Sequence, residues 1–160
     1  MSSLTIRRAR RGEEALILTL LRELAEYEKL LGSFHITEEV IRRDYLGEPA
    51  LLNCDLAFAG GEPVGFATWY WTYASFAAAR GIFLEDLYVR SKFRGQGHGK
   101  ELLAHLARTA VAANAVRVEW SVLDWNKPSI EFYELLGARR HDGWYMYRLE
   151  HDALKKLGDT

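Results

Sequence analysis

An apolar strand, followed by a glycine-rich turn and then a helix, limits the folds that this chain can adopt. Residues 82–89 read IFLEDLYV, an apolar run that carries two adjacent acids. The turn RGQGHG (94–99) follows, and residues 99–113 then repeat leucines at helical spacing. Because such a helix must bury its apolar face, this junction indicates a sheet covered by helices.

The rest of the chain extends this pattern. Thr37 and Asn126 stand where helix N-caps belong. No linker, repeat or low-complexity segment interrupts the order, which predicts one α/β (α+β) domain over residues 1–160. Helices are expected at 13–31, 37–46, 99–113 and 127–137, and strands at 4–10, 51–59, 63–73, 82–89, 115–123 and 144–150, with a polar tail after them.

Composition narrows the partners and the compartment. The 21 basic and 22 acidic residues give a net charge of −1, so the overall charge of the chain gives no reason to expect binding to nucleic acid or to an anionic membrane. The apolar runs fall short of the roughly 20 residues of a membrane span, and the N-terminus lacks a signal-peptide core. The single Cys54 fits a reducing compartment, and the five histidines show no ligand spacing. We expect a cytoplasmic protein without a metal, nucleic-acid or membrane partner.

The glycine turn offers backbone amides to an anion. Glycine permits positive φ and lets another group approach the backbone closely. The first turn of the next helix adds unpaired N–H groups, so phosphate is the expected occupant, with a purely structural turn as the alternative. The P-loop signature fails because Glu101 follows Gly99-Lys100. The dinucleotide signature fails because the loop reads GQGHG and lies in the second half of the chain.

A third signature fits. Arg94-Gly95-Gln96-Gly97-His98-Gly99 resembles the Gln/Arg-x-x-Gly-x-Gly/Ala pattern of the GNAT N-acetyltransferases, and the order of elements agrees over essentially the whole chain. LEDLYV, RGQGHG, VLDWN and DGW are similar to the diamine acetyltransferase group, which includes spermidine/spermine and thialysine enzymes. The resemblance implies a single GNAT-like domain whose mixed central sheet has about six to seven strands and about four flanking helices.

The resemblance also implies acetyl-CoA as co-substrate, with its pyrophosphate on the loop amides. The His98 side chain is expected to point outward rather than to act in catalysis. Asn126 is explained equally well as a helix cap. The expected CoA-binding residues are Leu87, Tyr88 and Val89 through their backbone, the loop residues Arg94, Gly95, Gln96, Gly97, His98, Gly99 and Lys100, and Asn126 and Ser129.

Acetyl transfer to an amine requires a base for the ammonium, whose free pKa is about 10.4, and an acid for the departing thiolate. By resemblance Tyr133 is the candidate acid, and the alternative is a packing role like that expected of Phe132. Glu85 is the candidate base, acting through water, while Asp86 attracts a cationic acceptor. On a regular strand these two acids point to opposite faces, and the alternative is a solvated pair at the strand end.

Four further residues match acceptor-side positions of the family. Tyr27 and Glu28 end the first helix, where related enzymes cover the acceptor. Without the resemblance they would be a half-exposed aromatic and a solvated acid. Asp142 and Trp144 in DGW match acceptor-side positions as well.

These features predict an N-acetyltransferase that moves an acetyl group directly, in a ternary complex, to a small cationic amine: a diamine, a polyamine or a thialysine- or lysine-like amino acid. Ala74-Ser75 lacks the acid of polyamine-type enzymes, which favours a short diamine or an amino-acid-like acceptor over spermine. The alternatives are a protein N-terminal or lysine acetyltransferase and a non-catalytic acyl-CoA-binding module. A homodimer is implied because related enzymes build acceptor sites across two subunits.

Overall fold

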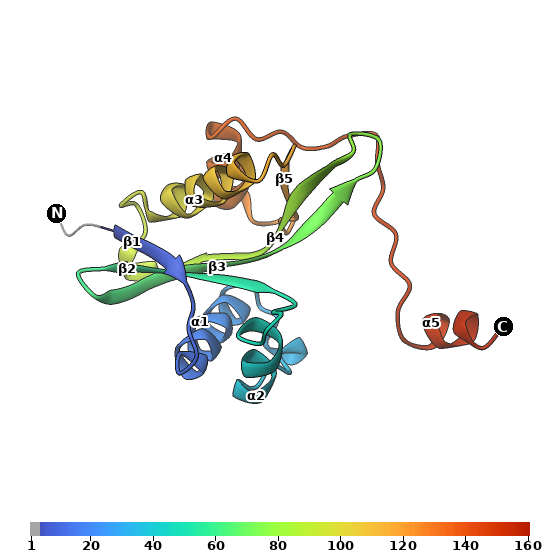
Figure 1. Cartoon of the computed structure of the whole chain (residues 1–160), viewed down its shortest axis with the longest axis horizontal. Coiled ribbons are helices and arrows are strands. Elements are labelled where there is room, and N and C mark those ends of the chain that lie inside the picture. Colours follow the sequence, from blue (N-terminus) through green and yellow to red (C-terminus); the bar gives the residue numbers. More distant parts are fainter. Residues whose placement is uncertain (1–3) are drawn as a thin grey trace. The chain divides into compact units, whose positions relative to one another are not determined.

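The computed structural model describes residues 4–160 (Figure 1). They form two compact units, of which the first ends at Trp125 and the second runs from Asn126 to Thr160. Within residues 4–160 no helix has the length and apolar character needed to cross a membrane.

A mixed five-stranded sheet forms the centre of the first unit. The first four strands pair antiparallel, and the fifth pairs parallel to the fourth. The α/β class is therefore confirmed, with five strands among the described residues rather than about six to seven. In sheet order the strands are β1 (Leu4–Arg8), β2 (Asn53–Ala59), β3 (Glu62–Ala74), β4 (Ala79–Val89) and β5 (Val118–Trp120).

Helices cover both faces of this sheet (Figure 1). α1 (Glu14–Tyr27) and α2 (Glu38–Val40) lie on one face, and α3 (His98–Ala112) lies on the other. The Thr37 hydroxyl accepts a hydrogen bond from the Val40 amide at 3.3 Å, so α2 begins as expected. It then widens into the π-helical segment η2 (Ile41–Tyr45). Two short 3₁₀ turns, η1 (Leu31–Ser33) and η3 (Ser91–Phe93), complete the first unit.

Period-two alternation along the strands divides the buried side chains between two hydrophobic cores. On the α1 face, Leu20 packs with Leu56 and Phe66. On the α3 face, Leu106 packs with Ile82. Burying a large apolar side chain stabilises the fold by about 1.5–3 kcal/mol, so a one-residue slip of any strand would expose its core residues. The two cores thus fix the register that positions the site.

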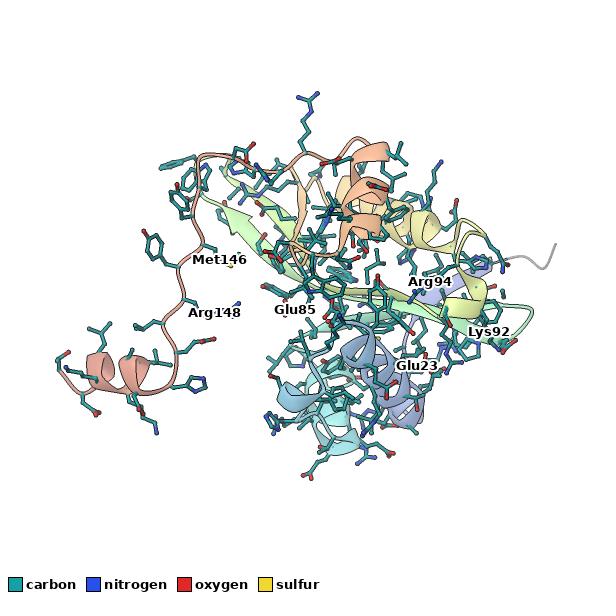
Figure 2. All side chains as sticks on the ribbon, turned by 180° about the vertical axis from the view of Figure 1, so that it is seen from behind. Glu23, Glu85, Lys92, Arg94, Met146 and Arg148 are labelled. Carbon is teal, nitrogen blue, oxygen red and sulfur yellow. The ribbon has the colours of Figure 1, made fainter. Side chains whose placement is uncertain are left out.

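The second unit contains α4 (Lys127–Leu135) and α5 (His151–Gly158). Asn126 caps α4 as expected, since its side-chain oxygen accepts from the Ser129 amide at 3.4 Å. The strand expected at 144–150 is wrong, because this segment is irregular and the second unit has no described strand to pair with it. Met146 and Arg148 extend away from the ribbon there (Figure 2). The expected polar tail instead forms α5.

Candidate active site

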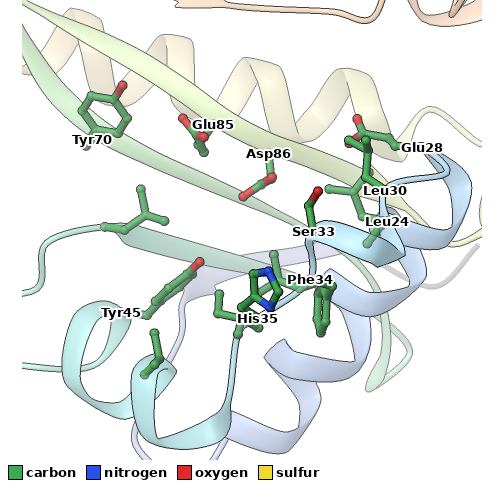
Figure 3. A pocket seen from close by; sticks show the side chains of 15 residues that line it. Leu24, Glu28, Leu30, Ser33, Phe34, His35, Tyr45, Tyr70, Glu85 and Asp86 are labelled. Atoms are coloured by element: carbon green, nitrogen blue, oxygen red, sulfur yellow. The ribbon is translucent and has the colours of Figure 1, made fainter. Parts of the chain in front are cut away.

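A pocket of about 740 Å³ lies in the first unit, on the α1 face of the sheet (Figure 3). Apolar side chains such as Leu24 and Phe34 form much of its wall, and the carboxyl groups of Glu28, Glu85 and Asp86 supply its charge. Neither lysine nor arginine lines it within the described part of the chain. The remaining polar groups are Ser33, His35, Tyr45 and Tyr70.

A β-bulge brings two of these carboxyl groups to the same side. Thr68 of β3 pairs with Asp86, but the next residue, Trp69, pairs with Leu84, so Glu85 has no residue opposite it. An extra residue interrupts the alternation of a strand and turns its side chains. Glu85 and Asp86 therefore both line the pocket, and the expectation that they point to opposite faces is wrong. The reason is the bulge, since adjacent side chains point to opposite faces only on a regular strand.

The environment of Asp86 favours its neutral form more than water does. Burial raises the pKa of Asp86 to about 6, although a hydrogen bond from the Thr68 hydroxyl acts in the opposite direction. The nearby Glu85 and Glu28 raise this pKa further by like-charge repulsion. Burial also raises the pKa of Glu28. Carboxyl groups that are desolvated and crowded together without a cation are suited to receive one from a ligand.

The glycine loop has the backbone geometry that an anion site requires. Gly95 and Gly97 take φ values of 74° and 85°, in the left-handed region. Gly99 instead lies in the first turn of α3, so its conformation is helical. Gly97 is the N-cap residue of α3, and no side chain caps this helix end. The side of Gly95 and Gly97 where a side chain would stand is open. The first-turn amides of α3 can thus reach an anion.

Arg94 ties this loop to the end of α1 and to β4. Its Nε donates to the Val89 carbonyl at 2.9 Å. Its guanidinium lies 4.6 Å from the centre of the Tyr27 ring and 5.7 Å from that of Tyr88. Tyr27 therefore contacts the loop arginine and is absent from the residues that line the pocket, whereas its neighbour Glu28 lines it. The loop and the pocket meet through the end of α1.

His98 differs from the sequence expectation. Its Nε2 is buried, has no hydrogen-bond partner among the described residues, and its ring stands edge-on to Phe93 with the centroids 6.4 Å apart. The expectation that the imidazole points outward is therefore wrong. The ring packs behind the loop because Phe93 of η3 provides an apolar surface for it.

The β4 strand leaves part of its backbone accessible. Leu87, Tyr88 and Val89 pair with β3 on one side, while β5 pairs only with Ile82–Leu84 on the other. Beyond Leu84 this second edge of β4 has no strand partner within residues 4–160. Backbone amides and carbonyls along such an edge can bind an extended chain with amides of its own. This is the kind of surface expected for the pantetheine arm.

Comparison with known proteins settles the family. The sequence matches the acetyltransferase (GNAT) family over residues 17–138. The chain belongs to the GNAT acetyltransferases. It is 38% identical to the thialysine N-epsilon-acetyltransferase of Sus scrofa, over 98% of both chains. It is 32% identical to the human (Homo sapiens) spermidine/spermine N(1)-acetyltransferase-like protein 1, over 96% of this chain and 24% of that protein.

One solved structure has a similar fold over the whole length of this chain. The integron cassette protein VCH_CASS6, from the mobile metagenome of V. cholerae, superposes with a TM-score of 0.85 at 26% identity, over 100% of this chain and 99% of that one. The family match and the names of the relatives make this GNAT protein an N-acetyltransferase. The family resemblance expected from the glycine signature is confirmed.

The remaining expected site residues of this GNAT protein lie in the second unit. Tyr133 is half-buried on α4, and its ring centroid is 5.3 Å from that of Phe132. Asp142 is exposed and accepts from Arg140 at 2.8 Å. Trp144 is exposed as well. Their roles, and those of Asn126 and Ser129 toward CoA, stay predictions.

Sequence reasoning missed three residues of the GNAT site. Tyr45 and Tyr70 line the pocket, and burial raises the pKa of both phenols. Thr68 is fully buried beside Asp86. The available signal was a hydroxyl inside the apolar strand run GFATW, because a buried hydroxyl requires a hydrogen-bond partner. Within residues 4–160 no group of three or more His, Cys, Asp or Glu side chains could hold a metal.

Proposed function

We propose that this GNAT protein acetylates a primary amine of a small cationic acceptor, with acetyl-CoA as the donor. The observation that carries the proposal is the pocket, whose described lining has three carboxyl groups and neither lysine nor arginine. A desolvated carboxylate attracts an ammonium strongly, and charge-assisted hydrogen bonds are about twice as strong as neutral ones. An acceptor of this charge suits the site better than a neutral or anionic one.

Acetyl-CoA fits the glycine loop, the first turn of α3 and the accessible edge of β4. The amides around Gly97 and the first turn of α3 would hold the pyrophosphate, with Arg94 and Lys100 adding positive charge. The free edge of β4 at Leu87–Val89 would pair with the pantetheine amides. Support for this assignment comes from the left-handed glycines, the helix end without a capping side chain and the strand edge without a partner.

The proposed reaction takes place in a ternary complex. The ammonium gives a proton to Glu85 through water, and the free amine attacks the thioester carbonyl. A C–N bond forms, the C–S bond breaks, and the thiolate leaves with a proton from the Tyr133 phenol. The nitrogen gives up its second proton as the amide forms, and this proton restores the phenol through water. Asp86 and Glu28 hold the cationic acceptor. The net products are the acetylated amine, free CoA thiol and one proton.

Two lines of support point to different acceptors within this class. Relatives named for thialysine cover 98% of the chain, which favours an amino-acid-like acceptor. Among residues 4–160 neither lysine nor arginine lines the pocket, which favours a diamine because the carboxylate of an amino acid would meet none of these cations there. Protein lysine or N-terminal acetylation and a non-catalytic acyl-CoA-binding role remain the alternatives. By family resemblance we also propose a cytoplasmic homodimer.

Charge variants of the pocket test this proposal. Asp86→Asn and Glu85→Gln should each raise the acceptor KM for a diamine at least tenfold, because each removes a carboxylate that lines the pocket and attracts the ammonium. Glu85→Gln should also move the pH–rate profile to higher pH, since the amine would have to arrive already neutral. Glu101→Gln, an exposed acid on α3, is the matched control. Unchanged acceptor kinetics in both pocket variants would exclude this acceptor site.

A further inference from the structure

The Thr68 hydroxyl is a polar group that packing alone does not explain. Thr68 is fully buried in β3, two residues from Phe66, which packs in the α1-side core. Residues two apart on a strand face the same side, so the Thr68 side chain faces the pocket side of the sheet. An isosteric valine would suit a buried strand without any need for a partner. The buried hydroxyl therefore indicates a specific hydrogen bond.

That interaction is with Asp86. The two residues are direct cross-strand partners, and the Thr68 hydroxyl donates to Oδ2 of the Asp86 carboxylate. The pair is the last one in register before the bulge at Glu85. Because the bulge releases the strand from its regular alternation, the direction of the Asp86 side chain there depends on its own contacts. Thr68 supplies such a contact from a rigid, central strand.

We propose that Thr68 is a positioning residue that holds the Asp86 carboxylate in its charged form in the pocket, as the anchor for the acceptor's ammonium. The inference rests on the proposed acceptor site and adds a residue that none of the family assignments above includes. A hydroxyl that donates to a carboxylate stabilises the ionised state, since a protonated carboxyl accepts this bond less well.

The surroundings of Asp86 make its ionisation depend on this hydrogen bond. Burial raises the pKa of Asp86 to about 6, close to the pH at which an enzyme works, and the Thr68 bond holds it below a still higher value. Glu28 and Glu85 oppose ionisation, while Tyr45 stays a neutral phenol because burial raises its pKa. The titratable groups that share the pocket with Asp86 are Glu28 from the end of α1, His35 from the loop before α2, Tyr45 from η2, Tyr70 from β3 and Glu85 from β4 (Figure 3).

Loss of the hydroxyl should change the pH range in which the acceptor binds. A hydrogen bond to a charged group corresponds to about one to two pKa units, so Thr68→Val should raise the pKa of Asp86 by that amount. At pH 7 about half to nine tenths of the Asp86 carboxyls would then be protonated, and the acceptor KM would rise about two- to tenfold. Near pH 9 the carboxyl would ionise again, and the KM would return toward the wild-type value.

The experiment has one readout that depends on activity and one that does not. The side-chain carbon resonance of Asp86, assigned by its loss in Asp86→Asn, is titrated by NMR in wild type, Thr68→Val and Thr68→Ser. The acceptor KM for a diamine is measured in the same proteins from about pH 5.5 to about pH 9, a range that spans the expected rise in the pKa of Asp86. Thr68→Ala replaces Thr68→Val if the valine variant does not fold.

Matched variants separate positioning from packing. Thr68→Ser keeps the hydroxyl and should restore both the titration and the KM profile. Thr72→Val is the control on the same strand, because the Thr72 hydroxyl is buried without a hydrogen-bond partner among the described residues. It should leave both readouts unchanged. A KM that rises equally at every pH would assign Thr68 to packing and overturn the proposal.

The two readouts also distinguish the inference from the function on which it rests. An unchanged Asp86 titration in Thr68→Val would overturn the role of Thr68, whatever the activity. A shifted titration with an unshifted KM profile would overturn the link to the acceptor. If the wild-type protein acetylates no amine although Asp86 titrates as expected, the proposed function fails, and only the hydrogen bond's effect on Asp86 survives.

Discussion

Two adjacent carboxyl groups, Glu85 and Asp86, share one pocket because a single extra residue breaks the alternation of β4. Their surroundings then make them unequal. Asp86 is held by Thr68 and its pKa is raised to about 6, whereas Glu85 is the exposed residue of the bulge. This difference supports the proposed anchoring role of Asp86 and the proposed proton-accepting role of Glu85, which water can reach. At the residue scale, the acid role of Tyr133 stays a proposal.

The variant Tyr133→Phe tests that role. It keeps the ring and its contact with Phe132 and removes only the phenol hydroxyl, so the fold and the affinity for CoA should survive. Loss of a positioned general acid typically lowers kcat by about 10²–10⁴-fold with little change in the KM for acetyl-CoA. Steady-state kinetics in both substrates measures this. Wild-type kcat where chemistry limits the rate would show that Tyr133 only packs, and parallel loss of CoA binding would indicate the same.

At the scale of elements, the turn between η3 and α3 shows how a short sequence becomes a binding surface. Gly95 and Gly97 take left-handed conformations, and α3 then starts at His98 without a capping side chain. Arg94 folds back onto Tyr27 and Tyr88 and so stays clear of the open side of the loop. The result is a helix end whose amides are capped by no side chain among the described residues.

Replacement of Gly97 by valine should remove CoA binding. The new side chain would strain a residue whose φ is 85° and would occupy the side that the pyrophosphate needs. Gly61→Val is the matched control, because Gly61 has a φ of 84° and lies in the β2–β3 turn. Calorimetric titration with CoA should show binding in the control and a loss of at least tenfold in Gly97→Val. Equal CoA affinity in the two folded variants would exclude the phosphate site.

Features set by local chemistry were predictable from the sequence, and features set by pairing were not. The glycine loop, the Thr37 and Asn126 caps and the helical spacing of α1 and α3 follow from residues close together in the chain. The bulge at Glu85 depends on register with β3, which no local pattern encodes. Residues 144–150 are rich in the aromatic residues that strands favour, but a strand also needs a partner. The role of Thr68 could not be predicted from the sequence, because its hydrogen-bond partner Asp86 lies on the neighbouring strand.

At the scale of the whole molecule, the site reduces the stability of the fold. The usual pKa of Asp86 is 3.8 and its pKa in the folded protein is about 6. Between these values the folded state binds more protons than the unfolded state, so the free energy of unfolding falls as the pH rises from about 4 to 6. Above pH 6 the free energy of unfolding is lower by the full amount, about 3 kcal/mol at most. Sites that need a desolvated charge commonly carry such a cost.

The variant Asp86→Asn should therefore be more stable than the wild type at pH 8. We expect the free energy of unfolding to increase by about 1–3 kcal/mol there, and the difference to vanish near pH 4, where the wild-type carboxyl is protonated. Urea unfolding at the two pH values measures both quantities. A variant less stable than wild type at pH 8 would show that the carboxylate stabilises the fold, contrary to its raised pKa.

The most direct test of the central claim is acetyl transfer by the purified wild-type protein. Acetyl-CoA is supplied with a short diamine, thialysine, spermine or a lysine-containing peptide, and free CoA thiol is measured together with the mass of the product. We expect thiol and a monoacetylated small amine to form in equal amounts, with the diamine or thialysine as the best acceptor. Transfer to the peptide alone, or CoA binding without transfer to any amine, would contradict the account.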